Sequence, residues 1–124
     1  MALTVALIRS ANTAMGKQAI ADVTFDSSYP TNGETIDFTA APFTGLDAFT
    51  SVYTVEVAEG PYTSAGAKLA ATVCTRVDYD FSASRVVSTG KLVAYAESAT
   101  GEATEGANTT DLSTVVVRMR IMGT

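Results

Sequence analysis

The sequence contains no histidine and no tryptophan, and its only cysteine is Cys74. Histidine is the commonest general base and metal ligand, so its absence excludes a Ser-His-Asp hydrolase and a histidine-ligated metal centre. One cysteine cannot form an internal disulfide, and without a histidine to activate it the thiol is a poor nucleophile. We therefore predict no catalytic residue, no metal site and no cofactor, and we expect Cys74 in the core or at an interface.

Charged residues are also scarce, at 17% of the chain, whereas hydrophobic residues make up 47%. This composition is typical of a globular protein, and a chain of 124 residues can bury one core, so we predict a single domain over residues 1–124. The net charge of −5 repels nucleic-acid phosphates and anionic lipid headgroups, which argues against nucleic acid and membrane partners. The apolar segment 1–9 is short and has no basic residue before it, so we interpret it as a strand and not as a signal peptide.

The sequence does contain alternation with a period of two residues, the pattern of half-buried strands. The pattern is clearest over Leu69–Phe81, where Val73 and Val77 share the apolar face, and over the closing strand Val115–Met122. Further strands are expected at residues 3–10, 17–25, 51–58 and 91–97. We predict an all-β fold, a single-domain antiparallel β-sandwich or barrel-like fold with long loops.

Glycine and proline mark the expected strand ends. Residues 30–33 (Pro-Thr-Asn-Gly) predict a turn, and the pair 60–61 (Gly-Pro) predicts the end of a strand because proline lacks the N–H that a ladder needs. The pair 89–90 (Thr-Gly) is interpreted as a hairpin turn. Residues 40–50 predict a short helical turn or a plug over a sheet edge. Residues 98–110 are rich in small polar and acidic residues and predict a long exposed loop.

Two groups of carboxylates are candidates for cation binding or acid-base chemistry. Asp78 and Asp80 project from one face of a predicted strand. The second group surrounds the first predicted turn and comprises Asp22, Asp26 and Asp37. No calcium-loop or phosphate-loop motif accompanies either group. We therefore favour solvated carboxylates on a wet sheet face, with calcium at a turn as the alternative.

Two further features suggest binding. Arg9, Arg118 and Arg120 are candidates for binding a carboxylate-rich partner, although we favour the interpretation that they line a polar sheet face. Apolar residues also occur on the second face of several predicted strands; these are Ile20, Val93, Tyr95, Val116 and Met122. Either a second sheet or a partner molecule covers them, so oligomerisation is our working hypothesis.

Four segments resemble sequences of a known protein family. They are residues 22–34 (DVTFDSSYPTNGE), 91–95 (KLVAY), 110–118 (TDLSTVVVR) and 121–123 (IMG). Together they resemble the head decoration, or capsid cement, proteins of tailed bacteriophages. The segment 61–70 has no counterpart in the resemblance, and the acidic segment around Glu102 and Glu105 and the predicted strand 69–81 depart from it.

The resemblance implies a virion structural protein that is made in the host cytoplasm and binds the exterior of the capsid. It implies the major capsid protein and the chain itself as partners, with a homotrimer favoured over a homodimer, and it supplies no catalytic residues. One alternative is a phage tail or head-fibre component. A less favoured one is a carbohydrate-binding adhesion module, because only 8% of the residues are aromatic. An enzyme is the least favoured interpretation.

Overall fold

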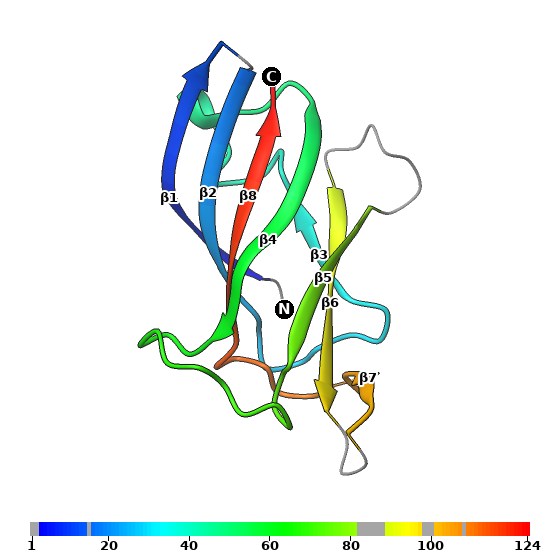
Figure 1. Ribbon diagram of the computed structural model, residues 1–124. Coiled ribbons are helices and arrows are strands. Elements are labelled where there is room, and N and C mark those ends of the chain that lie inside the picture. Colours follow the sequence, from blue (N-terminus) through cyan, green and yellow to red (C-terminus); the bar gives the residue numbers. More distant parts are fainter. Residues whose placement is uncertain (1–2, 15, 82–88, 98–100, 108) are drawn as a thin grey trace.

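The structure is a computed structural model that describes residues 3–14, 16–81, 89–97, 101–107 and 109–124. Within these residues eight strands form two antiparallel four-stranded sheets (Figure 1). In sheet order, the first comprises β1 (Thr4–Thr13), β2 (Gly16–Thr24), β8 (Val116–Gly123) and β4 (Val52–Tyr62). The second comprises β3 (Glu34–Asp37), β6 (Thr89–Glu97) and β5 (Arg76–Phe81), with β7 (Ala103–Glu105) beside β6. The predicted all-β, sandwich-like fold is confirmed.

The two sheets pack around one core, and the alternation of β2 and β8 supplies its first half. The buried positions of these strands are Ala19, Ala21, Val23, Val117, Met119 and Ile121. The second sheet contributes Ile36, Val77, Leu92 and Ala94, and aromatic residues fill the ends of the core at Phe25, Tyr29, Phe38 and Phe43. The inward face that the sequence predicts for the closing strand is therefore confirmed.

The expected strand over residues 69–81 is wrong in its first half. β5 begins only at Arg76, because the preceding residues form a turn in which the backbone N–H groups of Val73 and Cys74 donate to the carbonyl of Ala70. Val73 is consequently 40% exposed instead of buried. Cys74 is buried, as expected, but it reaches the core from this turn and not from a strand.

Two other predicted boundaries are also wrong. Thr89 and Gly90 lie within β6, where Gly90 pairs with Ile36 on one side and Phe81 on the other. β4 runs past the Gly60-Pro61 pair to Tyr62. A shift of register between Glu59 and Tyr62 accommodates Pro61, which has no backbone N–H to donate. Gly60 has a φ of 108°, a conformation that suits glycine and lets the strand continue through the irregularity.

The segment 98–110 is not wholly an exposed loop. β7 lies within it and pairs with β6, and Glu105 at its end is half-buried. Tyr95 of β6 pairs with both β5 and β7, so β7 lies on the flank of β6 opposite β5, beyond β3. Positions 98–100 and 108 lie outside the described residues.

The predicted turn at residues 30–33 is confirmed, with the N–H of Gly33 donating to the carbonyl of Pro30 at 3.1 Å. The helical turn expected within residues 40–50 is η1 (Gly45–Asp47), a single 3-10 turn. Lys17 holds it against β2, because its Nζ donates to the carbonyls of Leu46 and Ala48 at 2.7 Å each. In the described part of the chain, no helix has the length and apolar character to cross a membrane.

Candidate functional site

The predicted carboxylate groups do not converge. Asp78 and Asp80 are exposed on β5, and Asp78 accepts from Nε of Arg76 at 3.1 Å. Asp37 accepts from the backbone N–H and the hydroxyl of Thr39, and these hydrogen bonds lower the pKa of its carboxyl. Across the ranges that the structure describes, no three histidine, cysteine, aspartate or glutamate side chains gather in a way that suits a metal ion.

Asp22 belongs instead to a polar cluster that joins three neighbouring strands. From β8, Arg118 donates to both carboxylate oxygens of Asp22, at 2.8 Å through Nε and 3.0 Å through an Nη atom. From β4, the hydroxyl of Tyr62 donates to the same carboxylate at 3.0 Å. The hydrogen bonds from Arg118 hold the pKa of Asp22 below its usual value, so the carboxylate stays charged and paired.

The three candidate arginines have different surroundings. Arg120 forms an ion pair with Glu56 of β4, and Arg118 forms the bidentate pair with Asp22. Both therefore line a polar sheet face, as the favoured interpretation predicted. Arg9 is exposed on β1 and forms no ion pair with any residue in the described ranges, so it alone of the three keeps its charge unmatched.

A shallow groove crosses the outer face of the first sheet near these arginines. Its volume is about 600 Å³. Its lining combines apolar and charged residues from β1, β2, β4 and β8; it includes Ile8, Ile20, Val57, Glu59, Arg9 and Arg118. Arg118 and Arg120 are ion-paired within the sheet, whereas Arg9 forms no ion pair in the described residues. A mixture of apolar side chains and mostly paired charged groups suits contact with a protein surface.

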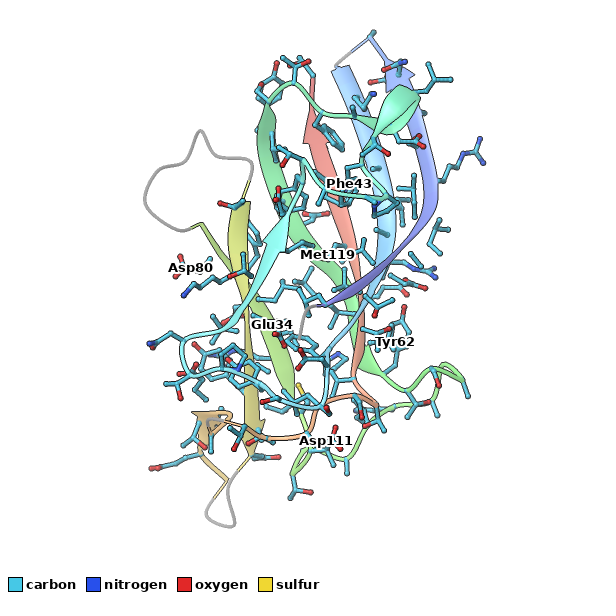
Figure 2. The ribbon with its side chains drawn as sticks, turned by 180° about the vertical axis from the view of Figure 1, so that it is seen from behind. Glu34, Phe43, Tyr62, Asp80, Asp111 and Met119 are labelled. Atoms are coloured by element: carbon cyan, nitrogen blue, oxygen red, sulfur yellow. The ribbon has the colours of Figure 1, made fainter. Side chains whose placement is uncertain are left out.

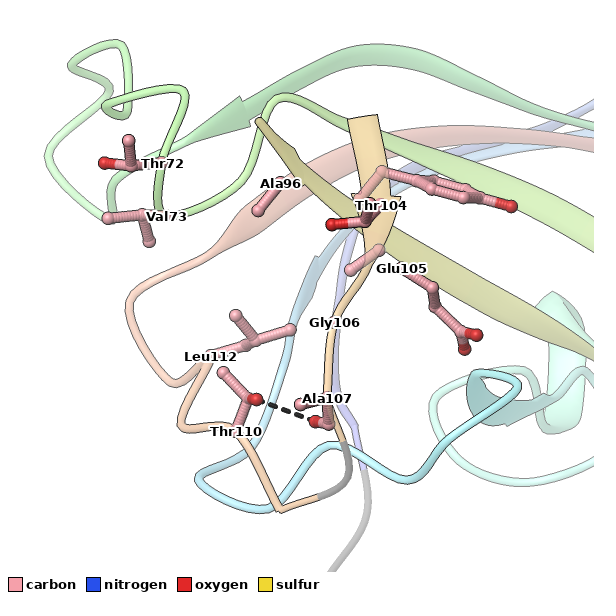
Figure 3. A pocket seen from close by; sticks show the side chains of 11 residues that line it. Thr72, Val73, Ala96, Thr104, Glu105, Gly106, Ala107, Thr110 and Leu112 are labelled. Carbon is pink, nitrogen blue, oxygen red and sulfur yellow. Dashed lines mark hydrogen bonds between the residues drawn. The ribbon is translucent and has the colours of Figure 1, made fainter. Parts of the chain in front are cut away.

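A second hollow lies at the far end of the other sheet, between β7 and the turn that precedes β5 (Figure 3). Its volume is about 270 Å³, and its lining consists mainly of small side chains together with Val73, Tyr95 and Leu112. Its carboxylate, Glu105, is engaged by the hydroxyl of Tyr29 at 3.0 Å and by the N–H of Asn32. The residues that line this hollow therefore include no free acid or base.

Cys74 is also unsuited to chemistry. Burial raises the pKa of its thiol to about 11, so the thiolate is scarce at neutral pH. The side chain is 2% exposed, and its Sγ lies 3.5 Å from the carbonyl oxygen of Arg76. The expectation that Cys74 is a small core residue is confirmed.

The sequence analysis missed a buried pair of acids, Asp26 and Glu34. Asp26 is 7% exposed and Glu34 is 4% exposed, so the interpretation of Asp26 as a solvated carboxylate is wrong. Glu34 is labelled between the two sheets in Figure 2. Burial and the neighbouring Asp26 raise the pKa of Glu34 to about 7. One oxygen of each carboxyl lacks a hydrogen-bond partner. A proton shared between the two carboxyls would give each of these oxygens a partner.

A signal for this pair was present in the sequence. Glu34, Ile36 and Phe38 have the spacing of a single strand face, and all three are buried. No sequence pattern marked Asp26 as buried, because it lies beyond the end of β2. Its position depends on a distant residue, since its backbone carbonyl accepts a hydrogen bond from the N–H of Leu112.

The apolar residues expected on outer faces divide into two groups. Val116 is 5% exposed and is covered by its own chain, whereas Ile20, Val93, Tyr95 and Met122 are half-buried. Four large apolar side chains are clearly exposed, namely Ile8, Leu46, Tyr53 and Val73. The described surface thus offers contact area in several places.

Comparisons with known protein families, with curated proteins and with solved structures find no match for this chain.

Proposed function

We propose that this chain is a capsid cement protein, which binds the outer surface of a tailed-phage head and cross-links major capsid subunits. The observation that carries the proposal is the uncovered outer face of the first sheet, with its groove of satisfied ion pairs and apolar side chains. Contact with a protein at this face would leave Arg118 and Arg120 paired within the sheet and would place Arg9, the one arginine of the groove without an ion pair in the described residues, against the partner.

The resembling segments support the proposal through their position. Residues 22–34 join the first sheet to the second, residues 91–95 lie in β6, and residues 110–118 lead into β8. They therefore contribute to both sheets and to the connection between them. A cement protein needs only a modest interface in each copy, because several linked copies on one shell gain avidity from their effective concentration.

The test uses empty heads of the phage that encodes the chain. The purified protein is expected to co-sediment with these heads and to raise their melting temperature. Ile20→Ser, in the groove, should weaken co-sedimentation, whereas Leu46→Ser, at a residue that is 94% exposed and outside the groove, should not. Failure of the wild-type protein to bind heads contradicts the proposal, and binding to tails alone favours the fibre alternative. Equal binding by the two variants would show that the groove does not contribute to head binding.

A further inference from the structure

Sheet edges are sites where another strand can add, and most edges of this molecule carry features that hinder such addition. The free edge of β4 is interrupted by register shifts in three places, and it carries Glu56, Glu59 and Pro61. β5 carries three charged residues within six positions. β3 and β7 are only four and three residues long.

β1 lacks these protections. It is ten residues long, contains no proline, and carries a single charge at Arg9. In the described part of the chain it pairs with β2 only, and Figure 1 shows it as the outermost strand of its sheet. Its one irregularity is a bulge between Leu7 and Arg9 that makes Ile8 an extra residue relative to β2. Ile8 is 51% exposed.

The bulge makes β1 complementary to itself. Residues that lie opposite each other in an antiparallel pair must point to the same face. Leu7 and Ser10 are three positions apart and would face opposite ways in a regular strand, yet both are half-buried because the bulge adds one residue between them. Two copies related by a two-fold axis at the bulge can therefore place Leu7 of one copy opposite Ser10 of the other.

This register is consistent along the strand. Leu7 lies opposite Ser10, Ala6 opposite Ala11, Val5 opposite Asn12 and Thr4 opposite Thr13 of the second copy. The exposed residues Ala6 and Ala11 meet on the outer face. Arg9 faces Ile8 and not the second Arg9, so its aliphatic stem covers an apolar side chain and no like charges lie directly opposite.

We propose that β1 is a homodimer interface in which two copies pair antiparallel about the bulge and join their first sheets into one continuous sheet. The occupant of the edge is a second copy of this chain, since the register is isologous and needs no other partner. The proposal stands on the edge geometry alone and is independent of binding to phage heads.

The experiment is sedimentation-equilibrium ultracentrifugation of the full chain over a range of concentrations. The wild-type protein is expected to dimerise. The double variant Ala6→Lys with Ala11→Lys places like charges opposite each other twice per dimer, and should raise the dimer dissociation constant about tenfold. The double variant Ala6→Lys with Ala11→Glu places opposite charges there instead and should restore dimerisation.

A matched control adds two lysines elsewhere, through Thr54→Lys with Ala58→Lys at exposed positions of β4. This control should dimerise as the wild type does, and circular dichroism checks that every variant keeps its strands. A monomeric wild-type protein contradicts the proposal. So does a dimer that tolerates the like-charge variant, that the opposite-charge variant fails to restore, or that the β4 control weakens equally.

Discussion

Tyr29 connects several segments that are far apart in the sequence. Its side chain is fully buried, and its hydroxyl donates to Glu105 at 3.0 Å while accepting from the backbone N–H of Ala94 at 3.2 Å. Its backbone forms hydrogen bonds with Thr109 and Thr110. One side chain therefore links the connection after β2 to β6 and to the end of β7.

Removing this hydroxyl should be costly. Tyr29→Phe leaves the buried Ala94 N–H without a partner and leaves Glu105 with the Asn32 N–H as its remaining donor, so we expect a loss of about 1–3 kcal/mol in the free energy of unfolding. Urea denaturation measures this loss. The matched control is Tyr53→Phe, at a residue that is 56% exposed, where the change should stay within about 0.5 kcal/mol. Equal stabilities for the two variants would show that the Tyr29 hydrogen bonds contribute nothing.

Glu34 should make stability depend on pH. Its folded pKa is about 7, raised from 4.5 by burial and by Asp26, so the folded state holds a proton that the unfolded state releases earlier. The free energy of unfolding should therefore fall as pH rises from about 4.5 to 7, and this part of the dependence should be flat above that window. Glu34→Gln, which keeps a neutral side chain, should remove the fall and be the more stable form above pH 7.

The measurement is the difference in unfolding free energy between wild type and Glu34→Gln at several pH values. Glu59→Gln, at an exposed position, provides the control and should follow the wild type. A constant difference between wild type and Glu34→Gln from pH 4.5 to 8 would contradict the raised pKa of Glu34.

At the scale of elements, β6 contains a glycine, Gly90, that does not lie in a turn. Gly90 lies in the strand, and a Cβ placed on it would overlap the ring of Tyr79. Tyr79 comes from the paired strand β5 and occupies the space that a side chain at position 90 would need. The glycine therefore serves the packing of an aromatic ring over the strand.

A double-mutant cycle tests this role. Gly90→Ala alone should destabilise the fold by about 1–3 kcal/mol, because the ring of Tyr79 must move. In a Tyr79→Ala background the same change should cost much less, since the obstructing ring is gone. Both costs are read from urea denaturation. If the two changes prove additive, Gly90 and Tyr79 are not coupled in the way the structure indicates.

The alternation of apolar and polar residues was enough to predict β2, β8 and most of β6. Each of these strands has one face in the core, and few residues interrupt its alternating pattern. It failed over residues 69–75, where apolar residues alternate but the carbonyl of Ala70 accepts two turn hydrogen bonds. It also failed at Gly90, because a glycine in a strand and a glycine in a turn look alike until the position of Tyr79 is known. The local sequence pattern does not show which side chain from another strand fills the space beside a residue.

The polar sites were harder to predict for the same reason. Asp22 and Arg118 are 96 positions apart, and their pairing follows from the adjacency of β2 and β8, which no spacing in the sequence reveals. The pair of Asp26 with Glu34 similarly depends on how the end of β2 meets the start of β3. The expectation that Cys74 is buried was confirmed because it rested on the general behaviour of free cysteine and not on a strand assignment.

At the scale of the whole molecule, the described structure is a two-sheet sandwich with one open sheet edge at β1 and one grooved outer face on the same sheet. In the two proposals, the edge is the site of self-association and the face is the site of adhesion to a second protein. Ile8 and Arg9 belong to both surfaces, so a dimer joined through β1 would bring two grooves together at the bulge of one continuous sheet. A bivalent molecule of this kind is suited to cross-linking neighbouring subunits of a shell.

The most direct test of the central proposal is a cryo-electron microscopy reconstruction of virions of the phage that, on this proposal, encodes the chain. The proposal predicts density for an eight-stranded, two-sheet fold on the outer surface of the head, in contact with more than one major capsid subunit. Density only on the tail, or virions that lack the chain altogether, would contradict it.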